Sequence, residues 1–135
     1  MSEDIAKVVT DWVSAAMGAD VHTEYGYLGT ISNSCMVRAA PGDPVERRYL
    51  SGGGVYRFPY EVYLRAVPRN APGSRIDCLA RLRSLQAVIE AGGVPDVPVA
   101  WQSHEVTQVP SLYRTEASGA EVYLLSAVLT YVERS

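Results

Sequence analysis

The chain has 135 residues, of which 47% are hydrophobic and 20% are charged, and its formal net charge is −3. This length fits one domain, residues 1–135, whose single core requires neither a metal nor disulfides. A negative net charge argues against a sequence-specific nucleic-acid partner, since such proteins usually carry a basic patch. The apolar stretches fall short of the roughly 20 residues that span a bilayer, so we expect no membrane partner.

A helix is the first predicted element. We expect Ser2 to cap it and Gly18 to end it. Between them, apolar residues recur at helical spacing: Ile5, Val8, Val9, Trp12, Val13 and Ala16. The acidic, amphipathic character of this segment does not fit a signal peptide. Residues 18–31 are expected to be irregular, and their pattern indicates no role.

Two short strands are predicted next, at residues 33–40 and 45–50. The segment between them, Pro41-Gly42-Asp43-Pro44, has the composition of a turn. After the second strand, Ser51-Gly52-Gly53-Gly54 predicts a tight turn, because glycine adopts backbone angles that other residues avoid.

The clearest strand signal runs from Tyr56 to Ala66. Apolar residues take every second position there, which is typical of a strand with one face on a core. Pro59 has no N–H to donate to a neighbouring strand, so we expect a sheet edge or a bulge at this point.

A second helix is predicted after residue 73, with Ser74 as its cap and Gly92-Gly93 at its end. Its expected core-facing stripe consists of Ile76, Leu79, Leu82, Leu85, Val88 and Ile89. Residues 99–109 are predicted as a strand and residues 110–119 as a polar loop.

The last strand, residues 121–132, is apolar on both faces, which favours a central position in a sheet. Strands joined by turns and separated from the helices favour an antiparallel or mixed sheet. We therefore predict the α+β class, with a mixed, mainly antiparallel sheet of four or five strands and both helices packed on one face.

Reactive groups are few. Cys35 and Cys78 lack the spacing of a metal or redox motif, and we expect both to be buried and reduced. His22 and His104 each stand near one acidic residue, which is too few ligands for a metal site. The Gly52–Gly54 run lacks the following helix and lysine of a phosphate-binding loop. We therefore predict no catalytic, cofactor-binding or metal-binding residue, and no enzyme.

Arginine and tyrosine suggest contact with other proteins. The chain has nine tyrosines, and Lys7 is its only lysine among 12 basic residues. Arginine and tyrosine are enriched at protein interfaces, although base bias also explains an arginine excess and tyrosines also cover small cores. The candidate interface residues are Arg47, Arg48, Tyr113 and Arg114, for which the alternative interpretation is solvated turn residues.

The chain resembles a phage family over about residues 48–134. The segments that carry the resemblance are Tyr49-Leu50-Ser51-Gly52-Gly53, the strand Val55 to Leu64, the helix Ile76 to Ala91, Pro95, the Trp101 strand with Pro110-Ser111-Leu112, and Gly119-Ala120-Glu121-Val122-Tyr123 running into Leu129-Thr130-Tyr131-Val132-Glu133. Together they are similar to minor capsid proteins related to the tail terminators of long-tailed phages.

The resemblance implies a structural role. Tail terminators are small α/β domains that close into a hexameric ring, cap the tail tube and contact the head connector. It thus implies self-assembly, tail-tube and head-connector partners, and a location in the virion after assembly in the bacterial cytoplasm. Three alternatives stay open: a head-completion or connector-joining protein, a small bacterial ligand- or peptide-binding module with an apolar pocket, and an enzyme that pairs a cysteine with a histidine.

Overall fold

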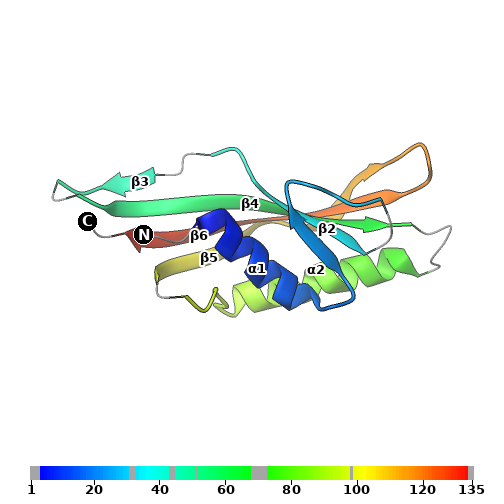
Figure 1. Ribbon diagram of the computed structural model, residues 1–135, viewed down its shortest axis with the longest axis horizontal. Coiled ribbons are helices and arrows are strands. Elements are labelled where there is room, and N and C mark those ends of the chain that lie inside the picture. The colour runs from blue at the N-terminus through cyan, green and yellow to red at the C-terminus, as the bar shows by residue number, and fades with distance from the viewer. Residues whose placement is uncertain are drawn as a thin grey trace.

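The structure, a computed structural model, describes residues 4–30, 33–42, 45–50, 52–67, 73–97 and 99–133, without the side chains of residues 45–48 and 74. In chain order its elements are α1 (Ile5–Met17), β1 (His22–Tyr25), β2 (Ser34–Ala39), β3 (Val45–Arg48), β4 (Gly54–Ala66), α2 (Ser74–Glu90), β5 (Ala100–Thr115) and β6 (Glu121–Glu133). The tip of the β5–β6 hairpin and strand β3 lie at opposite ends of an elongated molecule (Figure 1).

The strands form one sheet in the order β1-β2-β4-β6-β5, with β3 pairing β4 as a sixth strand. The β1–β2 pair is parallel, and the other pairs are antiparallel. The predicted α+β class and mainly antiparallel sheet are confirmed, with six strands where we expected four or five. The central position predicted for residues 121–132 is also confirmed, because β6 lies between β4 and β5.

Both helices pack on the same face of the sheet, as predicted. The buried core contains Val9 and Val13 of α1 and Leu82, Leu85 and Ile89 of α2. Opposite them lie alternate residues of the two long central strands: Phe58, Tyr60, Val62, Leu64, Ala66, Tyr123, Leu125, Ala127 and Leu129. Burial of these apolar side chains is the main stabilising contribution to the fold.

Helix α1 is capped by Asp4 and not by Ser2, the expected residue. The Asp4 carboxylate accepts a hydrogen bond of 3.0 Å from the Ala6 N–H, whereas Ser2 lies outside the described residues. Gly18 ends the helix as predicted, with φ +98°, and its N–H donates to the Ser14 carbonyl. A positive φ at this position favours glycine.

The prediction that residues 18–31 are irregular is wrong for one part. His22–Tyr25 form β1, which pairs in parallel with β2 from His22↔Ser34 to Tyr25↔Val37. This strand is only four residues long, and none of its side chains is fully buried. Its sequence, His-Thr-Glu-Tyr, has no apolar alternation. The pairing of β1 with β2 therefore depends on contacts with another segment of the chain rather than on a local pattern.

Helix α2 differs from the prediction in its cap and in its stripe. Gly73 is the N-cap and makes no side-chain cap bond, so Ser74 is the first helical residue. The buried stripe follows Cys78, Leu82, Leu85 and Ile89, at spacings of four, three and four residues. Ile76 and Val88 were expected on it, but they are 73% and 43% exposed because they point away from that line.

On one side of the central strand β4, strand pairing is interrupted around Pro59. Pairs with β2 end at Tyr60, and pairs with β3 begin at Tyr56. The Ala40 N–H still donates to the Pro59 carbonyl at 2.8 Å, but proline offers no N–H in return. The predicted edge is confirmed at this point, although β4 pairs with β6 along its whole length.

The prediction of a loop at residues 110–119 is wrong for most of its length. Strand β5 continues to Thr115, and the turn occupies only Glu116–Gly119, closed by the Glu116 N–H and the Ala120 carbonyl at 2.8 Å. β5 is an edge strand with four register shifts against β6. These irregularities break the two-residue alternation and accommodate Pro110, so the pattern resembles a loop.

Candidate functional site

The face of the sheet opposite the helices, called here the open face, carries most of the polar contacts between strands. Strand register places Arg38, Glu61 and Ser126 in one row across β2, β4 and β6, and Met36, Tyr63 and Leu124 in the next. Arg65, Val122 and Arg114 form a third row across β4, β6 and β5. These residues alternate with the core residues, so their side chains project to the other side of the sheet.

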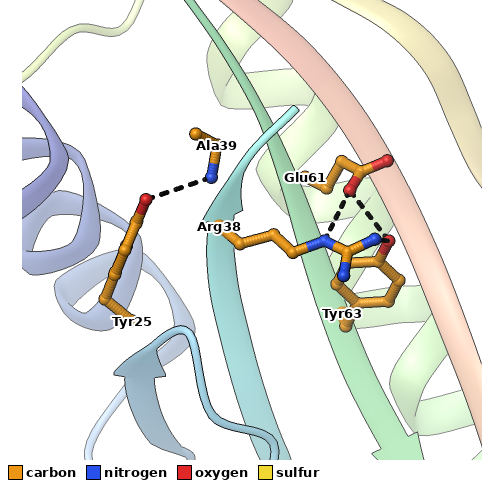
Figure 2. Close-up of polar contacts among 5 residues, drawn as sticks. All are labelled: Tyr25, Arg38, Ala39, Glu61 and Tyr63. Atoms are coloured by element: carbon orange, nitrogen blue, oxygen red, sulfur yellow. Dashed lines mark hydrogen bonds and ion pairs between the residues drawn. The ribbon is translucent and has the colours of Figure 1, made fainter. Parts of the chain in front are cut away.

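Arg38, Glu61 and Tyr63 form a closed set of contacts (Figure 2). Arg38 Nε donates to Glu61 Oε1 at 2.8 Å, and its NH2 group donates to the Tyr63 hydroxyl at 2.7 Å. The Tyr63 hydroxyl donates in turn to Glu61 Oε1 at 2.9 Å. The guanidinium also lies 4.9 Å from the centre of the Tyr63 ring. Each of the three polar groups therefore bonds to the other two.

The electrostatics of this set favour one protonation state. Burial, reinforced by the hydrogen bond to Glu61, raises the pKa of Tyr63 to about 12. The hydrogen bond to Glu61 also raises the pKa of Arg38. Tyr63 therefore remains a neutral donor and Arg38 a cation at physiological pH.

Two predicted interface residues, Tyr113 and Arg114, join this surface. The Tyr113 ring stands edge-on to Tyr63 with centroids 5.1 Å apart, and the Arg114 guanidinium lies 5.6 Å from the Tyr113 ring centre. Arg114 also donates to Glu116 Oε2 at 3.3 Å. Tyr113 is 45% exposed and Arg114 is exposed as well, so both present surface to solvent.

A bulge explains how consecutive residues reach the same face. The register of β5 against β6 shifts between Leu112↔Tyr123 and Arg114↔Val122, so Tyr113 is the additional residue. An additional residue in one strand redirects neighbouring side chains that would otherwise point to opposite faces.

Arg65 connects this bulge to the segment after β1. Its NH1 group contacts Glu116 Oε1, and its Nε donates to the Gly29 carbonyl at 2.6 Å. Hydrogen bonding from Arg65 holds the pKa of Glu116 below its usual range. Gly29 approaches the sheet so closely that a Cβ would lie 2.5 Å from Ser34 Oγ. Part of the segment with no expected role thus covers one end of the open face.

Arg47 and Arg48, the other two predicted interface residues, belong to a different part of the sheet. Their backbone pairs with Val55 and Gly54, at the end of β4 opposite Arg65. Their side chains lie outside the described part of the chain. Their interface role stays a prediction, and the four candidates do not form one cluster.

Sequence reasoning missed Arg38, Glu61, Tyr63, Arg65 and Glu116. The signal that could have found the three residues of β4 was their position between the apolar residues of a predicted strand. Their partners could not be predicted, because Arg38 and Glu116 reach them only through strand register.

The other half of the open face is hollowed into a groove of about 580 Å³. Its floor includes Pro59, Ser126 and Val128, and its walls are residues 40–42 on one side and Thr107 with Gln108 on the other. The groove lies on the opposite side of the sheet from the helices, and not between sheet and helices as expected for the ligand-binding alternative.

The cysteines are buried in the core, as predicted. Burial raises the pKa of Cys35 to about 12 and that of Cys78 to about 11. Cys78 Sγ donates to the Arg65 carbonyl at 3.5 Å. The described residues include no group of three or more His, Cys, Asp or Glu side chains placed to hold a metal ion.

The histidines have other partners. His22 Nε2 lies 2.8 Å from Glu24 Oε1 at the surface. His104 is buried, with Nδ1 2.8 Å from the Gly93 carbonyl and Nε2 2.6 Å from the Tyr60 hydroxyl. Among the described helices, neither is long and apolar enough to cross a membrane.

Comparison with known proteins relates the chain to solved structures. No family model matches the sequence, and no curated protein matches it. One structure, described by a sequence identifier, is similar over 96% of this chain and 90% of its own, with 14% identity and a TM-score of 0.54. That likeness shows a shared fold. A chain of a structure described as "Virion of native gene transfer agent (GTA) particle" is similar over 90% of this chain and 84% of its own, with 15% identity and a TM-score of 0.49.

Proposed function

We propose that this chain is a structural protein of a phage-like particle, and that it acts by assembling with copies of itself and with neighbouring virion proteins. The observation that carries the proposal is the outer edge of β5. Within the described residues, this strand pairs only with β6. Along it Val109, Leu112 and Tyr113 are 59%, 51% and 45% exposed. Exposed apolar and aromatic side chains gathered along one strand favour a protein partner.

The two edges of the sheet differ, which favours head-to-tail assembly. The opposite edge consists of the short strand β1, and past the last β1–β2 pair the hydroxyl of Tyr25 accepts a 3.3 Å hydrogen bond from the Ala39 N–H of β2 (Figure 2). That bond occupies a donor that a strand added to β2 past the end of β1 would need. Contacts between unlike surfaces build a ring when the rotation closes.

The finer proposal is a tail terminator or minor capsid protein that forms a ring, with six copies as the implied number. The ring would cap the tail tube and present a surface to the head connector. Support comes from the resemblance of residues 48–134 to that family. In this proposal Tyr113 and Arg114 contribute to contacts between protein chains, as do Arg47 and Arg48.

Electron microscopy of particles produced without this protein tests the role. We expect tails longer than normal, because the tube continues to grow without its terminator. Tails of normal length beside unattached heads would overturn the terminator role and indicate a head-joining protein. Normal, infectious particles would overturn the structural role altogether.

Light scattering on the purified chain tests the role of the β5 edge in self-association. We expect Leu112→Ser to reduce self-association, whereas Ile76→Ser, which removes an exposed apolar side chain from α2, leaves it unchanged. Equal effects of both substitutions would contradict a specific role for the β5 edge.

A further inference from the structure

The turn between β3 and β4 carries a leucine, Leu50, whose side chain is not buried in the fold. The Gly52 N–H donates to the Tyr49 carbonyl at 3.1 Å, and the Tyr49 N–H donates to the Gly53 carbonyl at 3.3 Å. Leu50 lies within this turn with a relative exposure of 109%, as open as in an extended chain, and Tyr49 is 40% exposed. Turns usually place small or polar residues at such positions. The side chain of Leu50 is therefore available to another molecule.

The groove on the open face is concave and partly apolar, so its lining suits an apolar side chain such as Leu50. Ala40, Pro41, Pro59 and Val128 supply apolar lining, and Thr107, Gln108 and Ser126 supply polar groups. Two irregularities create it. The chain leaves the sheet after Ala39, beside the gap at Pro59, and the register of β5 shifts between Val106 and Gln108.

A copy of the chain cannot fill its own groove with its own turn. Gly54, where the turn joins β4, is five residues from Pro59 on the groove floor. A strand rises about 3.3 Å per residue, so the two points are about 16 Å apart along β4. Because β4 pairs with β6 over this whole stretch, the turn cannot fold back onto the groove.

We propose that the Leu50 turn of one copy of this chain binds in the open-face groove of a second copy. This inference rests on the proposed self-assembly and assigns surfaces to it. Leu50 and Tyr49 supply an apolar projection, and the groove supplies apolar walls with polar groups that can hydrogen-bond the backbone of the turn. Since projection and groove lie on different parts of the chain, each copy can use both at once. The contact is therefore head-to-tail and suits a ring.

Disulfide trapping tests the contact directly. Cys35 and Cys78 are 1% and 0% exposed, so introduced thiols react selectively. A chain with Tyr49→Cys, which keeps Leu50, is mixed with a chain with Gln108→Cys and oxidised mildly. The matched control replaces Gln108→Cys by Gln102→Cys, another exposed glutamine of β5 that does not line the groove. We expect about tenfold more mixed dimer with Gln108→Cys, because burying a leucine strengthens a contact by about that factor or more. Equal yields in the two mixtures would overturn the proposal.

Self-association provides the second measurement. We expect Leu50→Ser to raise the concentration needed for assembly by about tenfold, with an unchanged melting temperature, since this side chain is fully exposed. Tyr27→Ser, at a residue that is 58% exposed, serves as the control and should assemble like the original chain.

The outcomes separate this inference from the proposed function. If Leu50→Ser assembles normally and trapping is no better than in the control, the turn-in-groove contact is wrong, while assembly through the β5 edge stands. If the original chain stays monomeric in light scattering but trapping exceeds the control, the contact is supported at a lower affinity. If particles made without the protein are normal, the virion role fails whatever the trapping result.

Discussion

The Tyr60 hydroxyl and His104 Nε2 are joined by a buried hydrogen bond of 2.6 Å between β4 and β5. Trp12 of α1 lies against the same imidazole with ring centroids 5.2 Å apart, and the Gly93 carbonyl after α2 occupies its other nitrogen. Helix α1, the segment that follows α2 and two strands thus meet at one titratable side chain.

Acid should weaken the fold through His104. Burial lowers the pKa of His104 below its ordinary value of 6.5. The unfolded chain therefore binds a proton at higher pH than the folded chain does, so the free energy of unfolding should fall as pH drops through about 6.5. Urea unfolding at pH 8 and pH 5.5 measures this change. His104→Gln should reduce the pH dependence, whereas replacement of the exposed His22 should leave it intact; equal behaviour of both variants would contradict the assignment.

Removal of the Tyr60 hydroxyl should destabilise the protein. Tyr60→Phe leaves the buried His104 Nε2 without its partner, which costs about 1–3 kcal/mol of the free energy of unfolding. Chemical denaturation checks the value. Tyr27→Phe, at a residue that is 58% exposed, is the control and should change stability by less than about 0.5 kcal/mol. A Tyr60→Phe variant as stable as the original would show that water replaces the hydroxyl.

The two thiols should be unreactive in the folded protein. Burial raises the pKa of Cys35 to about 12 and that of Cys78 to about 11, so few thiolates exist at pH 8. Iodoacetamide followed by mass spectrometry should give no modification of the native chain and two modifications after denaturation. Rapid labelling of the native chain at either cysteine would indicate that the core opens near it.

Arg65 should matter more to stability than Arg38. The Arg65 side chain is 8% exposed and donates to Gly29 and Glu116, whereas the Arg38 side chain is 47% exposed. We expect Arg65→Ala to cost about 2 kcal/mol, as for loss of buried hydrogen bonds to a charged group. Arg38→Ala should cost less than about 1 kcal/mol, as for an exposed ion pair. Thermal and urea unfolding compare the two, and equal losses would contradict the difference in burial.

The sequence predicted the elements that have a regular apolar period. Helix α1, strand β4 and strand β6 lie within a few residues of their expected bounds, because their buried side chains repeat along the chain. It did not predict β1 or residues 110–115 of β5. β1 has no fully buried side chain, and β5 shifts register four times, so neither keeps a period that a local pattern can show.

The candidate surface was predicted only in part. Tyr113 and Arg114 could be chosen from residue type, since both side chains are common at interfaces. Their neighbours Tyr63 and Arg65 could not, because a bulge at Tyr113 and the pairing of β6 with two strands decide which residues meet. These are properties of strand register, which depends on segments far apart in the chain.

The central β4–β6 pair joins Gly54–Ala66 to Glu121–Glu133, with α2 and β5 between them in the chain. During synthesis, the first of these strands leaves the ribosome long before its partner. The central β4–β6 pair can therefore form only once β6 has emerged. Until then the apolar side chains of β4 lack their neighbours on β6. Pairing between such distant segments slows folding and exposes the nascent chain to aggregation, so translation rate and chaperones should govern the yield of folded protein in cells.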